Sequence, residues 1–174
     1  MKLEQIEDVL LAAAQLTNHR NFVVVGSLSV LGAVLEPPQR MVASIDLDFF
    51  LKFDPERVSD INTQLGESSA FARARGYFAD ALSPRVLSLP DGWETRLIQL
   101  PLKGGLVAWF LDPNDCACSK LIRANPNDID WVRAGLAARI LAEPTIRSRL
   151  GHMQNVMDDD VARAVAALAA SLTC

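Results

Sequence analysis

The stretch FVVVGSLSVLGAVLEPPQRMVASIDLDFFL, residues 22–51, determines the fold that the sequence predicts. It opens with a β-branched run, which predicts a core strand over Val23–Val25 because such side chains favour strands. Gly26 and Ser27 follow at once, and apolar residues at helical spacing then predict a helix over Ser27–Leu35. A Pro-Pro pair ends that helix. The order of these signals predicts that the next strand lies beside the first one in the same sheet.

The next predicted strand, Ser44–Lys52, carries two carboxylates, Asp46 and Asp48. Alternate residues of a strand share a face, so these two side chains point to the same side. The intervening apolar residues are predicted to face the core: Ile45, Leu47 and Phe49. Neighbouring carboxylates repel each other unless a cation lies between them, and hard oxygen ligands of this kind suit Mg²⁺. The pair therefore predicts a site for Mg²⁺, with Mn²⁺ as the alternative. A solvent-facing strand edge would need no metal, but the apolar neighbours favour a central strand.

The Gly26-Ser27 turn has two interpretations. A Gly-Ser turn between a strand and a helix presents backbone N–H groups to an anion, and the Ser27 hydroxyl adds a polar group for a phosphate. The turn could equally be an ordinary helix start, with Ser27 as its N-cap. The carboxylates of Asp46 and Asp48 downstream favour the first interpretation, because a phosphate cradle opposite a metal site is the arrangement of a nucleotide-transfer site.

Gly-Ser after one strand and Asp-x-Asp on the next resembles the polymerase-beta-like nucleotidyltransferase superfamily. Further motifs make the chain similar to a family of small bacterial nucleotidyltransferases, which in turn resembles the abortive-infection toxin nucleotidyltransferases. These motifs are LPDGWETRL at 89–97, DPND at 112–115, SKL at 119–121, and Asp128. The resemblance extends from about residue 22 to about residue 150. It implies metal-dependent transfer of a nucleotidyl group from an NTP to an RNA, such as tRNA, or to a protein acceptor.

The resemblance also implies roles for individual residues. Lys120 would reach the triphosphate or the leaving pyrophosphate, although a surface lysine on the border of an apolar helix face is the alternative. Ser44 stands where the family has a threonine or serine before the first aspartate, in the nucleotide site. Asp128 would be a third active-site acid or would orient Lys120, and it also fits an ordinary helix start. Asn125 stands where the family usually has a basic residue.

The motif around Trp93 adds two expectations. The resemblance implies that Trp93 packs under the sheet, and Glu94 is a weaker candidate for a third metal ligand.

Composition narrows the class of protein. The chain has 174 residues, 50% hydrophobic and 22% charged, which is an ordinary globular balance. Its formal net charge of −4 argues against a dedicated nucleic-acid coat. No apolar run is long enough for a membrane span. The three cysteines, Cys116, Cys118 and Cys174, lack the spacing and the histidine partners of a zinc site. Such a sparse, odd set predicts a cytoplasmic location.

The rest of the sequence completes a predicted α+β (mixed α/β) fold. Helices are predicted at both ends and between strands: 3–17, 55–66, 68–79, 113–124, 127–140, 143–151 and 157–172. Further strands are predicted at 86–87, 95–100 and 106–111, with a hairpin turn at Gly104-Gly105. The expected architecture is a nucleotidyltransferase-like mixed central sheet flanked by helices, with a helical C-terminal half. We expect one domain over 1–174, with its sheet within about 20–112 and its helical part at about 113–174.

The sequence predicts an enzyme that acts on an NTP, with a toxin–antitoxin role implied by the resemblance. A cognate antitoxin or a second copy of the chain, as a homodimer, would be its protein partner. The alternative is a non-catalytic module on the same fold that binds nucleotide or a partner. The missing basic residue at Asn125 and the acidic net charge favour that alternative, whereas the pair of repelling carboxylates disfavours it.

Overall fold

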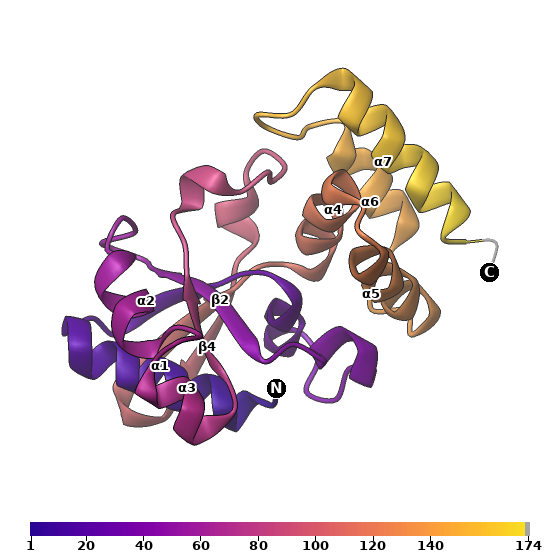
Figure 1. The fold of residues 1–174 in the computed structure, drawn as a ribbon. Helices are drawn as coiled ribbons and strands as arrows, with labels where there is room; N and C mark the ends of the chain where they lie inside the picture. Colours follow the sequence, from indigo (N-terminus) through magenta and orange to yellow (C-terminus); the bar gives the residue numbers. More distant parts are fainter. Residues whose placement is uncertain (173–174) are drawn as a thin grey trace.

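The structure, a computed structural model, describes residues 1–172, so Cys174 lies outside the described residues. Its centre is a mixed sheet of five strands in the order β3-β2-β1-β5-β4. The strands are β1 (Asn21–Val24), β2 (Asp46–Leu51), β3 (Phe78–Ala81), β4 (Ile98–Leu102) and β5 (Leu106–Phe110). Helices flank this sheet and make up the C-terminal half, which confirms the predicted fold class (Figure 1).

The pairing of the central strands agrees with the prediction from residues 22–51. β1 and β2 are antiparallel neighbours, with Val24 opposite Phe49. β1 also pairs in parallel with β5, and β2 pairs in parallel with β3. β4 and β5 are antiparallel and are joined through Gly104-Gly105, which confirms the predicted hairpin. β2 is therefore an inner strand, and Leu47 and Phe49 are fully buried on it.

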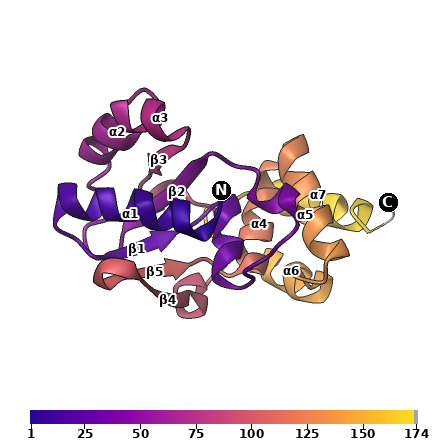
Figure 2. The same cartoon turned by 90° about the horizontal axis from the view of Figure 1, so that it is seen from below.

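The helices form two groups. The α-helices are α1 (Leu3–Thr17), α2 (Ser59–Leu65), α3 (Ala70–Arg75), α4 (Pro113–Arg123), α5 (Pro126–Ala137), α6 (Glu143–Leu150) and α7 (Asp158–Ala170). The short 3-10 helices are η1 (Ser27–Gly32), η2 (Gln39–Val42), η3 (Pro84–Val86), η4 (Trp93–Arg96) and η5 (Lys103–Gly105). Seen from below, α1 to α3 lie with the sheet, and α4 to α7 form a separate cluster beside it (Figure 2). None of the described helices is long and apolar enough to cross a membrane.

Helix α4 connects the sheet to the helical half. It begins directly after β5, with Asp112 as its N-cap and Pro113 at its first position. The Asp112 carboxylate accepts hydrogen bonds from the backbone N–H groups of Asn114 (2.9 Å) and Asp115 (3.3 Å). The apolar face of α4 is buried against η1, α5, α6 and α7, so α4 is the central helix of this half.

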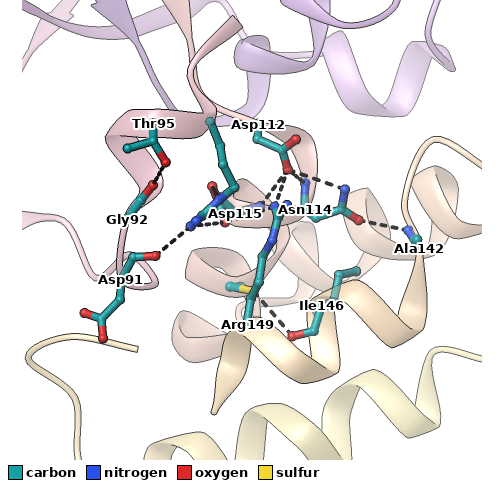
Figure 3. A network of polar contacts seen from close by, with 11 residues as sticks. Asp91, Gly92, Thr95, Asp112, Asn114, Asp115, Ala142, Ile146 and Arg149 are labelled. Carbon is teal, nitrogen blue, oxygen red and sulfur yellow. Dashed lines mark hydrogen bonds and ion pairs between the residues drawn. The ribbon is translucent and has the colours of Figure 1, made fainter. Parts of the chain in front are cut away.

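A buried ion network fixes the orientation of α4 (Figure 3). Asp115 has no exposed surface, and its carboxylate accepts hydrogen bonds from Arg96 Nε (2.8 Å) and Arg149 Nη1 (3.0 Å). Arg149 also contacts the Asp112 carboxylate at 2.5 Å, and Arg96 donates to the carbonyl of Asp91 at 3.0 Å. Arg96 lies in η4 and Arg149 in α6, so the network joins a loop of the sheet half to two helices.

Several local predictions were wrong. The helix predicted over Ser27–Leu35 is the six-residue 3-10 helix η1, and the helix predicted over 68–79 is the shorter α3. Gly76, with a φ of 74°, ends α3, and the chain then enters β3 instead of continuing as helix. The end of the predicted helix therefore belongs to a strand that the sequence did not suggest. Ile45, expected in the core, is 57% exposed because β2 begins only at the next residue.

The region before β4 also differs from the prediction. No strand forms at 86–87 in the described structure; Pro84 starts the 3-10 helix η3 instead. The predicted strand 95–100 begins only at Ile98, because η4 covers its first residues. Trp93, in η4, is partly buried and meets Phe50 of β2 edge-on, with ring centroids 6.4 Å apart.

Candidate active site

A cleft of about 320 Å³ lies between β1, β2 and helix α4. Apart from the weaker candidate Glu94, the residues that the sequence suggested for the site all line it. They are Gly26, Ser27, Ser44, Asp46, Asp48, Lys120 and Asp128. They come from segments up to about a hundred residues apart, which the fold brings to one place.

Three carboxylates meet at the edge of this cleft, and two of them, Asp46 and Asp48, line it. Asp46 and Asp48 extend from β2, and Asp80 extends from the neighbouring strand β3, where it pairs in register with Asp48. One carboxylate oxygen of each residue lies within 4.8 Å of those of the other two. A shared cation with oxygen ligands at about 2.0–2.6 Å fits such a spacing. The Ser44 hydroxyl donates a hydrogen bond to Asp46 Oδ1, which orients that carboxylate.

Sequence reasoning missed Asp80 because it placed this segment in or next to a helix. The available signal was Gly76 at the end of the Arg-rich helix, followed by the alternating run Tyr77-Phe78-Ala79-Asp80-Ala81. Glu94, the weaker sequence candidate for a third ligand, is exposed in η4 and is not part of the acidic cluster.

Burial and the repulsion of nearby carboxylates raise the pKa values of Asp48 and Asp80. The pKa of Asp48 rises to about 7, mainly because the carboxyl is buried and also because Asp46 and Asp80 repel its charge. Burial is likewise the first cause of the raised pKa of Asp80, followed by the charges of Asp46 and Glu67. The Asp48 carboxyl therefore titrates near neutral pH, and a bound cation would favour its ionised form.

Gly26 lets the Gly26-Ser27 turn lie directly against Asp48. Its backbone has φ 65° and ψ −159°, a conformation that is essentially restricted to glycine. A Cβ atom here would lie 1.9 Å from Asp48 Oδ2. Because η1 has only six residues, the turn offers an anion local N–H groups and the Ser27 hydroxyl, without the dipole of a long helix.

Two cations face the acidic cluster from α4. The Lys120 ammonium donates hydrogen bonds to Ser27 Oγ and to Asp128 Oδ1, each at 2.9 Å. Arg123, one turn further along α4, binds the same Asp128 carboxylate through Nε (3.2 Å) and Nη2 (3.0 Å). The guanidinium of Arg123 lines the cleft as well, although sequence reasoning did not select it. Its spacing of three residues from Lys120 on one helix was the signal.

Asp128 is engaged by these cations and does not belong to the acidic cluster. Burial alone would raise the pKa of Asp128, but the hydrogen bonds and charges of Arg123 and Lys120 outweigh burial and lower it. Of the two roles that the sequence left open for this residue, orientation of the cations is the one that its contacts favour.

A comparison with protein families identifies the family of the chain. The family model described as "Nucleotidyltransferase of unknown function (DUF6036)" matches residues 2–169. The chain belongs to this family. No curated protein and no solved structure matches it.

Because the chain belongs to a nucleotidyltransferase family, we asked whether the residues of the cleft fit a divalent metal ion. Nucleotidyltransferases generally use divalent metal ions, and the three clustered carboxylates offer the oxygen donors that such ions require. The raised pKa of Asp48 is what uncompensated carboxylates in a buried position would show. The residues of this DUF6036 nucleotidyltransferase are therefore compatible with a divalent cation at Asp46, Asp48 and Asp80.

Proposed function

We propose that this nucleotidyltransferase moves a nucleotidyl group from an NTP to an acceptor with the help of a divalent cation. The observation that carries the proposal is the arrangement of one cleft. Asp46 and Asp48 line it opposite the cations Lys120 and Arg123, with the Gly-Ser turn beside both, and Asp80 completes the acidic cluster at its edge.

In the proposed reaction, an acceptor hydroxyl attacks the α-phosphorus of the NTP. A new P–O bond forms, the bond from the α-phosphorus to the β-phosphate oxygen breaks, and pyrophosphate leaves. The proton of the hydroxyl goes to a carboxylate, and Asp80 is placed for this step because it is the most exposed member of the cluster. Gly26 and Ser27 hold the phosphates through backbone N–H groups and a hydroxyl, and Lys120 and Arg123 balance their charge.

Asp46, Asp48 and Asp80 would hold Mg²⁺, or alternatively Mn²⁺. The bound ion would neutralise charge on the phosphates and on the attacking oxygen. Ser44 keeps the Asp46 carboxylate turned toward this position. Gly26, Ser27, Lys120 and Arg123 would act on the phosphate chain and not on the ion.

The proposal leaves two classes of acceptor, RNA such as tRNA and a protein side chain. Support for both comes from the resemblance to abortive-infection toxin nucleotidyltransferases, which also suggests a cytoplasmic toxin–antitoxin component with a cognate antitoxin or a homodimeric partner. The acidic net charge of −4 does not favour RNA over protein.

The decisive experiment is incubation of the chain with each labelled NTP, Mg²⁺ or Mn²⁺, and either total RNA or total protein. We expect label transfer that the Asp46→Asn and Asp48→Asn variants lose and that Asp130→Asn retains, because Asp130 pairs with Arg40 on the surface of α5. Nucleotide binding without transfer in every combination would instead support a non-catalytic nucleotide-binding module. If the chain neither binds nor transfers any nucleotide, both interpretations are refuted.

A further inference from the structure

The two cations of the cleft differ in what they offer to a ligand. The side chain of Lys120 is only 4% exposed, whereas that of Arg123 is 49% exposed. The Lys120 ammonium donates to Ser27 Oγ and lies 5.2 Å from the centre of the Trp131 ring. A ligand that enters the cleft can therefore contact the side chain of Arg123 more readily than that of Lys120.

The hydrogen-bond donors of the two side chains show the same difference. The ammonium of Lys120 uses two of its three N–H groups, on Ser27 Oγ and Asp128 Oδ1. Arg123 has five N–H groups, and three of them donate to Asp128 and to Ser119 Oγ (3.3 Å). The other two, one on each Nη atom, have no protein partner within residues 1–172. Two free N–H groups on a half-exposed guanidinium match the geometry of two phosphate oxygens.

Asp128 fixes this guanidinium without cancelling the positive charge of the pair. Its single carboxylate is shared between Lys120 and Arg123, so the three groups together keep one positive charge. Asp128 accepts from Nε and from one N–H of Nη2, and Ser119 accepts from one N–H of Nη1, which leaves one N–H on each Nη atom for a ligand. The charge of Arg123 also acts on Asp48 across the cleft, where it favours the ionised carboxylate. The guanidinium thus lies within electrostatic reach of the acidic cluster.

We infer that Arg123 makes the direct hydrogen bonds to the phosphate chain of the nucleotide, and that Lys120 is a positioning residue that holds Ser27 and Asp128. The inference rests on the proposed function and refines it, because it reassigns the phosphate contact that the family resemblance gives to Lys120. Arg123 also supplies a cation in a cleft where Asn125 replaces the usual basic residue.

Calorimetry with the full chain in Mg²⁺ tests this division of roles. The probes are inorganic tripolyphosphate and a non-hydrolysable analogue of each NTP. We expect Arg123→Ala to weaken the binding of both probes about 10- to 100-fold, as the loss of hydrogen bonds to a charged group would. Arg123→Lys should recover only part of this, because an ammonium cannot replace the planar fork. The matched control is Arg147→Ala, since Arg147 is 47% exposed on α6 and also pairs with a carboxylate.

Lys120→Ala should behave differently from Arg123→Ala. We expect a smaller loss of tripolyphosphate affinity, together with faster amide hydrogen exchange at Ser27 and its neighbours, because the turn loses its tether. Arg123→Lys retains a charge for Asp128, so it keeps the inference testable if Arg123→Ala fails to fold. Thermal unfolding of each variant shows whether it is folded.

The outcomes separate this inference from the proposed function. If Arg123→Ala and Arg123→Lys bind both probes as the wild type does while the wild type still transfers nucleotide, the inference is wrong and the proposed function stands. A larger loss of affinity in Lys120→Ala, without any change in exchange at Ser27, would also overturn it. A wild-type chain that binds neither probe and transfers nothing would refute both.

Discussion

Replacement of Gly26 by alanine is the most direct test of the geometry of the site. The Cβ atom of an alanine would lie 1.9 Å from Asp48 Oδ2 and 2.7 Å from its carboxyl carbon, far inside van der Waals contact. The backbone at this position, with φ 65° and ψ −159°, would also be strained for any residue that has a Cβ. The variant must therefore move either the turn or the Asp48 carboxylate.

The structure provides a matched control for the size of the stability loss in Gly26→Ala. Gly76 also has a positive φ, 74°, but a Cβ there would meet no atom within 4 Å. Gly76→Ala should therefore lower the free energy of unfolding by about 1–2 kcal/mol through backbone strain alone. Gly26→Ala should add a packing penalty of about 1–3 kcal/mol to a backbone strain of about 1–3 kcal/mol. The difference between the two variants isolates the contact of Gly26 with Asp48.

Urea unfolding and Mg²⁺-dependent nucleotide binding measure the two consequences separately. We expect Gly26→Ala to lose about 10- to 100-fold in Mg²⁺ affinity, the range seen when groups that orient a metal ligand are disturbed. Gly76→Ala should bind as the wild type does, because Gly76 lies at the end of α3 and does not line the cleft. Unchanged Mg²⁺ affinity in Gly26→Ala, with an unfolding free energy equal to that of Gly76→Ala, would refute the reasoning.

Three further predictions concern the carboxylates. Because the folded chain raises the pKa of Asp48 from 3.8 to about 7, it retains a proton that the unfolded chain loses. The stability of the metal-free chain should therefore fall between about pH 4 and pH 7, by at most about 4 kcal/mol; urea unfolding at pH 5 and pH 8 checks this, and an equal pH dependence in Asp48→Asn would contradict it. Asp80→Asn should weaken Mg²⁺ binding at least about tenfold by calorimetry, whereas the exposed Asp60→Asn should not. Asp115→Ala should lower the free energy of unfolding by about 3–5 kcal/mol, because two arginines lose their buried partner; a loss no larger than that of Asp60→Ala in thermal unfolding would refute a stabilising role.

The sequence predicted the centre of the sheet because its signals there were local and unambiguous. The run Val23–Val25 and the alternation around Asp46 and Asp48 each determine a strand without help from distant residues. The segments that were predicted wrongly are short or have mixed signals. β3 has only four residues and follows a helix of similar composition, so propensity extended the helix into it. Pro84 could begin either a strand or a 3-10 turn, and the fold selected the turn.

The candidate site was predicted unevenly, for a physical reason. A residue type in a motif, such as Asp46-x-Asp48, is visible in the sequence because both side chains share one strand face. Asp80 joins them only through the parallel pairing of β3 with β2, which brings residues 32 positions apart into register. No local pattern encodes that pairing.

The same argument applies to the two cations. Lys120 and Arg123 share one face of α4, and a helical pattern cannot tell which of them is buried. That depends on how deeply α4 is set against η1, and the Arg96–Asp115–Arg149 network helps to fix that position from outside the cleft. Because burial decides which cation a phosphate can reach, the assignment of the phosphate contact depends on the tertiary structure, whereas the presence of cations at the site was already predictable from the sequence.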